Sequence, residues 1–188
     1  MNQLSTFIKD AVILVAATLV IFFGYYMIFS TNGSITAKSF YKTSIFLNAF
    51  VLVPLYGGYA FYKVFTYSKR KAKTATEIEH LMTFREGLRE GFLPLFLGGS
   101  VSLIIIFIFM NTSGLWLQDV LKDGFMDTFS DNNEASIKED IQKLREDESV
   151  MGVNLFSFRN FFAFYPLVLL YYIMISAFFA QFLKKRIY

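Results

Sequence analysis

The sequence predicts an all-α membrane protein in which four helices cross the bilayer. Three observations support this fold class. The 188-residue chain is 55% hydrophobic and only 18% charged, with a mean hydropathy of +0.45, a balance that soluble domains of this length rarely show. Four stretches almost without charge approach or exceed the roughly 18 residues that a membrane-crossing helix needs. The charged residues between these stretches are separated by sign along the chain.

The four predicted spans belong to one domain that covers residues 1–188. Their approximate limits are residues 11–29, 45–63, 92–111 and 161–183. In lipid each span must satisfy its own backbone hydrogen bonds, which favours helices over isolated strands. Pro94 and Pro166 stand early in their spans, where a missing N–H costs little. Pro54 stands nearer the centre of the second span and predicts an irregular helix there.

The connections between the spans predict the orientation of the chain. Six basic residues separate spans two and three: Lys69, Arg70, Lys71, Lys73, Arg85 and Arg89. The loop of about 112–159 between spans three and four instead carries ten acidic residues. Because basic loops tend to remain in the cytoplasm, we expect the basic connection and both termini to be cytoplasmic and the acidic loop to lie outside.

The acidic outer loop is long enough to contain structure of its own. The segment Ser136-Ile-Lys-Glu139 matches a capping box, and apolar residues then recur at helical spacing. This pattern predicts one amphipathic helix near Ile137–Asp147. The acidic residues are open to two interpretations, a cation-binding or docking surface and a simple solvated surface. Their spacing does not match a calcium-binding loop.

The motif FREGLREGF, residues 84–92, precedes the third span. On a helical projection it divides into an apolar face, an edge with Arg85 and Arg89, an edge with Gly87 and Gly91, and an acidic face with Glu86 and Glu90. This arrangement is typical of a helix that lies on the membrane surface. We therefore expect a surface helix that turns into the third span, with its acidic face in water.

Two sets of residues are candidates for functional contacts. The lipid-headgroup candidates are Lys69, Arg70, Lys71, Lys73, Arg85 and Arg89, although positive charge there is also what the topology alone requires. The candidates for close helix packing or partner binding are Gly57, Gly58, Gly87, Gly91, Gly98 and Ser102. The alternative for this second set is packing among the chain's own helices.

Catalytic motifs are missing from the sequence. It has no cysteine and a single histidine, His80, and it contains no phosphate-binding loop, hydrolase elbow or zinc-protease motif. We therefore expect no enzymatic activity, no cofactor, no metal site and no nucleic-acid binding. Asp10 and Lys63 lie at span ends, so no ionisable residue is expected at mid-bilayer, where ion-coupled carriers usually have one.

The chain resembles the four-helix membrane proteins of Bacteroidota catalogued as domain-of-unknown-function family 4199. The resemblance rests on the lead-in Phe84-x-Glu86…Gly91-Phe92, the acidic helical outer loop, and a last span ending in Phe182-Leu-Lys-Lys185. It implies a multi-pass protein of the bacterial inner membrane with no established activity. It also suggests membrane glycosyltransferases as partners, because family members are often encoded near them.

Two classes of function remain open from the sequence. The first is a non-enzymatic accessory or scaffold subunit of a larger inner-membrane complex, with other integral membrane proteins and membrane lipids as partners. The second is a lipid- or polyprenyl-handling protein that assists a membrane glycosyltransferase. A small-molecule transporter is a third, weaker alternative.

Overall fold

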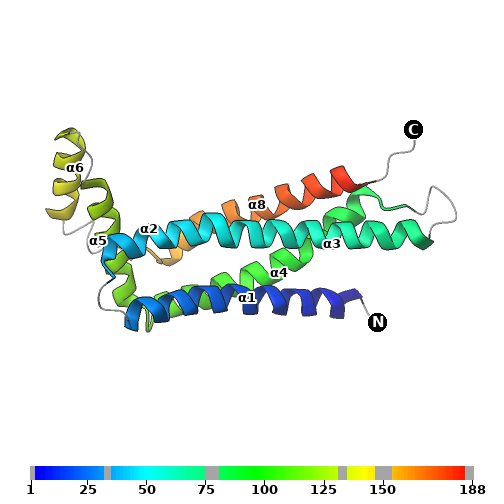
Figure 1. Ribbon diagram of the computed structural model, residues 1–188, viewed down its shortest axis with the longest axis horizontal. Helices are drawn as coiled ribbons and strands as arrows, with labels where there is room; N and C mark the ends of the chain where they lie inside the picture. Colours follow the sequence, from blue (N-terminus) through cyan, green and yellow to red (C-terminus); the bar gives the residue numbers. More distant parts are fainter. Residues whose placement is uncertain (1–2, 32–34, 75–80, 131–134, 147–153, 185–188) are drawn as a thin grey trace.

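The computed structural model describes residues 3–31, 35–74, 81–130, 135–146 and 154–184. Within these residues every regular element is helical, which confirms the all-α class. The elements are α1 (Gln3–Thr31), α2 (Ala37–Leu47), the π-helical turn η1 (Asn48–Leu52), α3 (Val53–Thr74), α4 (Phe84–Met110), α5 (Leu115–Ser130), α6 (Ala135–Glu146) and α8 (Phe158–Leu183) (Figure 1).

Four helical segments are long and apolar enough to cross a membrane, as predicted. They are α1, the continuous run α2–η1–α3, α4 and α8. The second segment covers Ala37–Lys73, far beyond the apolar stretch of about 45–63. Polar and charged residues can extend a helix past the hydrocarbon layer, because water and headgroups solvate them there.

The second span is irregular immediately before Pro54, as the sequence predicts. In η1 the N–H of Val53 donates to the carbonyl of Asn48, five residues earlier. Proline has no N–H to donate, and its ring crowds the carbonyl four residues before it. A wider π turn at this position accommodates both effects within one continuous helix.

The bundle is organised around α4, which packs against α8, α1 and α3, while α3 also packs against α8. Its central core contains Leu14, Tyr56, Ala60, Leu95 and Tyr172, all nearly inaccessible to solvent. The hydroxyls of Thr18 and Tyr56 form a 2.9 Å hydrogen bond across this core.

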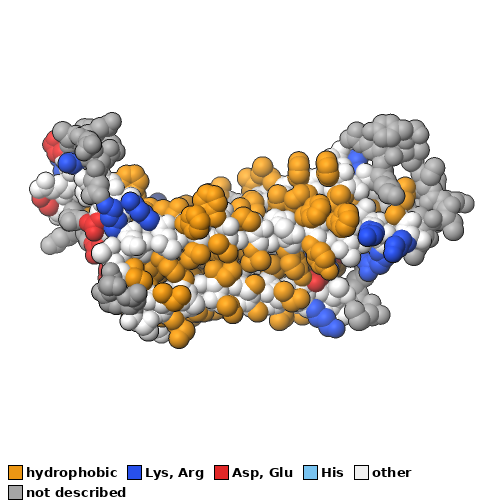
Figure 2. All heavy atoms as spheres, viewed as in Figure 1, with side chains coloured by type: hydrophobic (Ala, Val, Ile, Leu, Met, Phe, Trp, Pro, Cys, Tyr) orange, Lys and Arg blue, Asp and Glu red, His pale blue; other side chains and the backbone are white. Residues whose placement is uncertain are grey.

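The surface of the bundle has an apolar middle between two charged ends (Figure 2). Large apolar side chains such as Val20, Phe50 and Leu167 are more than half exposed, as lipid-facing residues would be. The first residues of α1, the end of α3, the start of α4 and the end of α8 lie together at one end, here called the basic end (Figure 1). The other end carries α5 and α6 and is called the acidic end.

The described residues of the acidic end form two helices, α5 and α6, so the prediction of one outer helix was incomplete. The 16-residue helix α5 packs against α2, and α6 packs against α5. Gly124 permits the α2–α5 contact, because a Cβ there would stand 2.6 Å from the Cβ of Tyr41. The predicted cap at Ser136 is wrong: α6 begins at Ala135, which places Ser136 inside the helix.

The FREGLREGF segment does not form a separate surface helix, so that prediction is also wrong. It is the first part of α4, which continues unbroken from Phe84 to Met110. Its glycine edge faces other helices of the bundle. Glu90, expected in water, is only 6% exposed, because the neighbouring helices cover that face of α4 as well.

Candidate functional site

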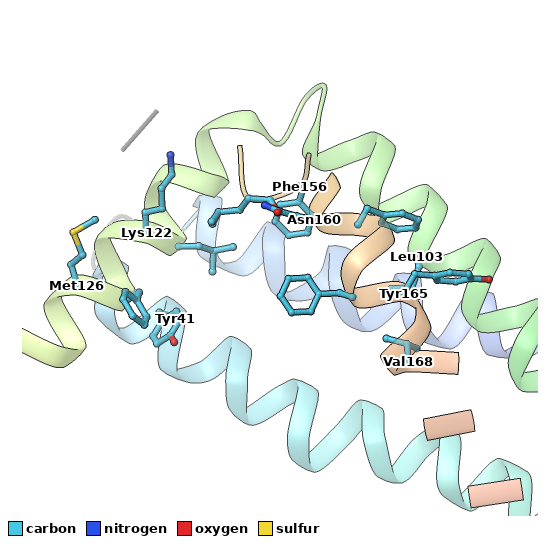
Figure 3. A pocket seen from close by; sticks show the side chains of 13 residues that line it. Tyr41, Leu103, Lys122, Met126, Phe156, Asn160, Tyr165 and Val168 are labelled. Atoms are coloured by element: carbon cyan, nitrogen blue, oxygen red, sulfur yellow. The ribbon is translucent and has the colours of Figure 1, made fainter. Parts of the chain in front are cut away.

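An apolar cleft of about 710 Å³ lies at the acidic end. Its walls come from α2, α4, α5, α8 and the segment just before α8 (Figure 3). Representative lining residues are Tyr41, Leu103, Phe125, Phe161, Phe164 and Val168. Phe125 and Phe164 are also exposed on the outside of the bundle, so the cleft opens onto the apolar surface.

Hydrogen bonds hold the backbone at the mouth of this cleft. The buried Gln118 of α5 donates from Nε2 to the carbonyl of Met110 at 2.9 Å, and its Oε1 accepts from the N–H of Leu155 at 3.0 Å. Asn111 donates to the carbonyl of Phe156 at 2.9 Å. The end of α4 and the segment before α8 are thereby tied to α5.

Few polar groups line the apolar cleft. Lys122 of α5 lies at one side, with its ammonium 2.9 Å from the carboxylate of Asp119. Asn160 lies at the start of α8, and the Tyr165 hydroxyl is 2.7 Å from that of Ser100. An apolar hollow with a few polar groups is typical of sites that bind hydrophobic molecules.

A polar cluster, missed by the sequence analysis, lies at the basic end. The ammonium of Lys63 on α3 is 2.6 Å from Oδ2 of Asp10 on α1. The Tyr59 hydroxyl donates to Oδ1 of the same carboxylate at 2.9 Å. The Lys63 and Asp10 side chains are only 14% and 12% exposed. The two span ends identified from the sequence thus form a nearly buried ion pair.

A second, polar cleft of about 320 Å³ adjoins this ion pair. It is lined by Thr6, Phe7, Lys63, Thr66, Tyr67, Arg70 and Glu90. The Glu90 side chain is 7% exposed, and its carboxylate lies 4.0 Å from the guanidinium of Arg89, at the limit for an ion pair. The cleft therefore places one buried carboxylate beside the cations of Lys63 and Arg70.

Glu86 stabilises the start of α4 rather than pointing into water. Its carboxylate accepts the N–H of Thr83 at 3.0 Å, while the Thr83 hydroxyl accepts the N–H of Glu86 at 3.3 Å. This is a capping box. The ammonium of Lys71 lies 3.0 Å from the Glu86 carboxylate, and the Tyr67 hydroxyl donates to the same carboxylate at 3.3 Å.

The lipid-headgroup candidates all lie at the basic end, but they differ in their surroundings. Lys69, Arg70, Lys73, Arg85 and Arg89 are exposed. Lys69 lies over the ring of Phe65 and Arg70 over that of Tyr67. Lys71 is half-buried in its ion pair with Glu86, so it is the least accessible of the six to a lipid phosphate.

Most of the small-residue candidates lie at contacts between the chain's own helices. A Cβ on Gly87 would stand 3.0 Å from that of Ala180, and one on Gly91 would stand 3.1 Å from that of Ser176. Gly98 faces Leu14 in the same way, and Gly57 is in ordinary contact with α8.

Two further small-residue candidates have different surroundings. Ser102 is buried and donates to the carbonyl of Gly98 at 2.8 Å. Gly58 is exposed, with nothing within 4 Å of an added Cβ. Gly58 is therefore open to lipid or to another protein.

Comparison with known proteins identifies the family at this point. Residues 9–185 match the family model described as protein of unknown function (DUF4199). The chain belongs to this family. No curated protein and no solved structure matches it. Membership agrees with the resemblance inferred from the sequence and assigns no activity to either cleft.

The basic-end cluster had a signal in the sequence. Lys63, Tyr67 and Arg70 recur at helical spacing on α3, and Glu86 and Glu90 are four residues apart on α4. Thr83-Phe-Arg-Glu86 also matches the capping-box pattern that was assigned only to Ser136–Glu139. The segment with Glu77, Glu79 and His80 lies outside the described residues. Within the described ranges, no three His, Cys, Asp or Glu side chains form a metal-binding group.

Proposed function

We propose that this DUF4199 protein binds the hydrocarbon chain of a lipid or of a polyprenyl carrier in a bacterial inner membrane, without catalysing a reaction. The observation that carries this proposal is the apolar cleft at the acidic end, which opens onto the apolar surface of the bundle. It supports the lipid-handling hypothesis over the accessory-subunit hypothesis. The cleft lies at the opposite end of the bundle from Arg85 and Arg89, the arginines among the lipid-headgroup candidates.

The lining of the cleft suits a hydrocarbon chain better than a polar solute. The walls are aliphatic and aromatic, and the aromatic rings of Phe161 and Tyr165 stack on each other with centroids 5.7 Å apart. A chain that entered from the bilayer would exchange lipid contacts for protein contacts of similar polarity. Selectivity would then depend on shape and on the polar groups beside the cleft, Lys122 and Asn160.

A phosphate group is the natural partner for the polar side of this cleft. Lys122 supplies an ammonium, and Asn160 supplies an amide. With the acidic end outside, as the charge distribution predicts, the bound molecule would come from the outer leaflet. A lipid-linked sugar presented to a glycosyltransferase fits this description.

Filling the cleft tests the proposal. Leu103→Trp and Val168→Trp each place a bulky ring in the cleft. Ile104→Trp and Leu167→Trp are matched controls, because those side chains are about half exposed on the outer surface of the same helices. After purification from native membranes in mild detergent, lipids that co-purify are identified by mass spectrometry.

We expect one lipid species to remain bound to the wild type and to both controls. The cleft-filling variants should retain about tenfold less of it. Equal retention by all four variants would contradict the proposal.

A second candidate function is the accessory or scaffold subunit, in which α5 and α6 would contact a partner protein. The α5–α6 pair extends past the end of the bundle (Figure 1), and most described side chains of α6 are exposed and charged. Reversing Glu139 and Lys143, which pair at 2.9 Å on that surface, leaves the bundle contacts intact. Loss of a co-purifying membrane protein in this double variant would favour the accessory role, and an unchanged set would count against it.

A further inference from the structure

We infer that the polar cleft at the basic end binds a phosphoethanolamine group, the headgroup of phosphatidylethanolamine. This site is distinct from the apolar cleft and does not depend on the function proposed for it. The inference rests on three features: a buried carboxylate, two cations lining the same cleft, and the position of all three beside the apolar middle of the bundle.

Glu90 is the feature that requires explanation. It lies on a membrane-spanning helix and is 7% exposed, with Arg89 at 4.0 Å as its ion-pair contact. A carboxylate removed from water is costly unless charge and hydrogen bonds compensate it. Ionisable groups in such positions are usually functional. Glu90 also lines the cleft, so a ligand there can reach it.

The cations that line the cleft indicate that the ligand also carries a negatively charged group. Lys63 and Arg70 line the same hollow and act electrostatically on Glu90. Lys63 is also paired with Asp10 at 2.6 Å, so a phosphate would share its ammonium with that carboxylate and take its main contact from Arg70. A guanidinium and an ammonium together are suited to phosphate oxygens. The hydroxyls of Thr6, Thr66 and Tyr67 add hydrogen-bonding groups to the same walls. A ligand with phosphate at one side and an ammonium at the other satisfies both charges.

Other ligand classes fit this charge arrangement less well. A metal cation would meet one cleft carboxylate but also two cations. A phosphatidylglycerol headgroup would place an uncharged glycerol near Glu90 and bring no cation to that carboxylate. A choline headgroup has the right charges, but its three methyl groups leave no N–H to donate to the carboxylate.

The position of the cleft favours a lipid over a free solute. The cleft adjoins the apolar middle of the bundle: Val64 follows Lys63, and Gly91 and Phe92 follow Glu90. Phe7, which is buried, lines the cleft beside the polar groups. A lipid whose headgroup lay here could keep its chains in the bilayer. The cleft volume of about 320 Å³ is at the lower end of the range for ligand sites, in keeping with a small headgroup.

The test measures lipid binding to the full chain in detergent by native mass spectrometry. The probes are dioctanoyl lipids with phosphoethanolamine, its N-methyl and N,N-dimethyl forms, phosphocholine and phosphoglycerol headgroups, together with soluble phosphoethanolamine. We expect phosphoethanolamine to bind about tenfold more tightly than phosphoglycerol. Affinity should fall at each methylation, because each step removes one N–H donor. This series needs only the wild-type chain, so it is informative even if a variant fails to fold.

Two variants locate the binding to the cleft. Glu90→Gln keeps the shape of the side chain but removes its negative charge. It should therefore abolish the preference for phosphoethanolamine over phosphocholine. Glu139→Gln, on the exposed surface of α6, is the matched control and should leave the preference unchanged. Arg70→Gln should weaken binding of every phospholipid in the series.

Three results would overturn the inference: no headgroup preference in the wild type, an unchanged preference in a folded Glu90→Gln variant, or binding of soluble phosphoethanolamine as tight as that of the lipid. The last result would assign the cleft to a free solute. The cleft-filling tryptophan variants at the acidic end should not alter the headgroup series, so failure here and failure of the proposed function are separable.

Discussion

Asp10 and Lys63 form an ion pair that joins α1 to α3 at the basic end, with 2.6 Å between Oδ2 and Nζ. Tyr59 donates a hydrogen bond to the other carboxylate oxygen at 2.9 Å. Both charged side chains are largely shielded from solvent. Each therefore compensates the charge of the other, which water alone would solvate poorly at this position. The pair therefore couples the position of α1 to that of α3.

Removing one charge of this pair should destabilise the fold. Asp10→Asn removes the carboxylate that is paired with the Lys63 ammonium. We expect the free energy of unfolding to fall by about 2–3 kcal/mol. This is less than for fully buried pairs, because the two side chains keep some exposure. The double variant Asp10→Asn with Lys63→Met should recover most of this loss. Unfolding in detergent titrated with dodecyl sulfate measures both changes. A single variant as stable as the wild type would show that the pair is solvated.

Gly98→Ala should disrupt the contact between α4 and α1. The added Cβ would stand 2.8 Å from Cβ of Leu14 and 3.1 Å from the carbonyl oxygen of Ala11, and a backbone atom cannot easily move away. We expect a loss of about 1–3 kcal/mol in unfolding free energy. Gly58→Ala is the control, because that site is open, and it should be neutral or stabilising by up to about 1 kcal/mol. Equal effects at the two sites would contradict this assignment.

Gln118→Leu should loosen the mouth of the apolar cleft. It removes the acceptor for the Leu155 N–H and the donor to the Met110 carbonyl. Losing partners for such groups costs about 1–3 kcal/mol. Gln142→Leu is a matched control, since Gln142 is exposed on α6 and donates to its helix neighbour Glu146 at 3.0 Å. Hydrogen exchange at Leu155 should rise in the first variant and not in the second.

The exposed arginines at the start of α4 should attract anionic lipid. Arg85→Ala with Arg89→Ala should weaken enrichment of phosphatidylglycerol around the protein by about 1 kcal/mol per residue at low salt. High salt should reduce the difference, because exposed charges are screened. Lipid composition in polymer-excised native discs provides the measurement, with the exposed Lys143→Ala at the acidic end as control. Unchanged enrichment would remove these arginines from the lipid-contact set.

The orientation of the chain can be tested directly because it has no cysteine. Lys69→Cys and Asp123→Cys place single thiols at exposed positions of the basic and acidic ends. By the positive-inside rule, an impermeant maleimide added to intact cells should label only the cysteine at 123. Labelling of both sites, or of the cysteine at 69 alone, would contradict the proposed topology.

The four spans could be predicted from the sequence because hydropathy is local and additive along a helix. The irregular turn before Pro54 was also predictable, since proline acts on its own helix. Helix α5 was missed because its apolar residues, such as Leu117 and Met126, are interspersed with aspartates and were assigned to a loop. The cap at Ser136 was misassigned because its pattern also occurs inside helices.

The sequence by itself determined the all-α class, the number of spans and the separation of basic and acidic ends, since each follows from residues close together in the chain. Only the tertiary structure decided which polar residues meet. Glu90 was expected in water, and its burial beside Lys63 depends on how α1, α3 and α4 pack. The apolar cleft likewise lies between elements far apart in sequence, including α2 and α5, whose contact at Gly124 local patterns do not encode.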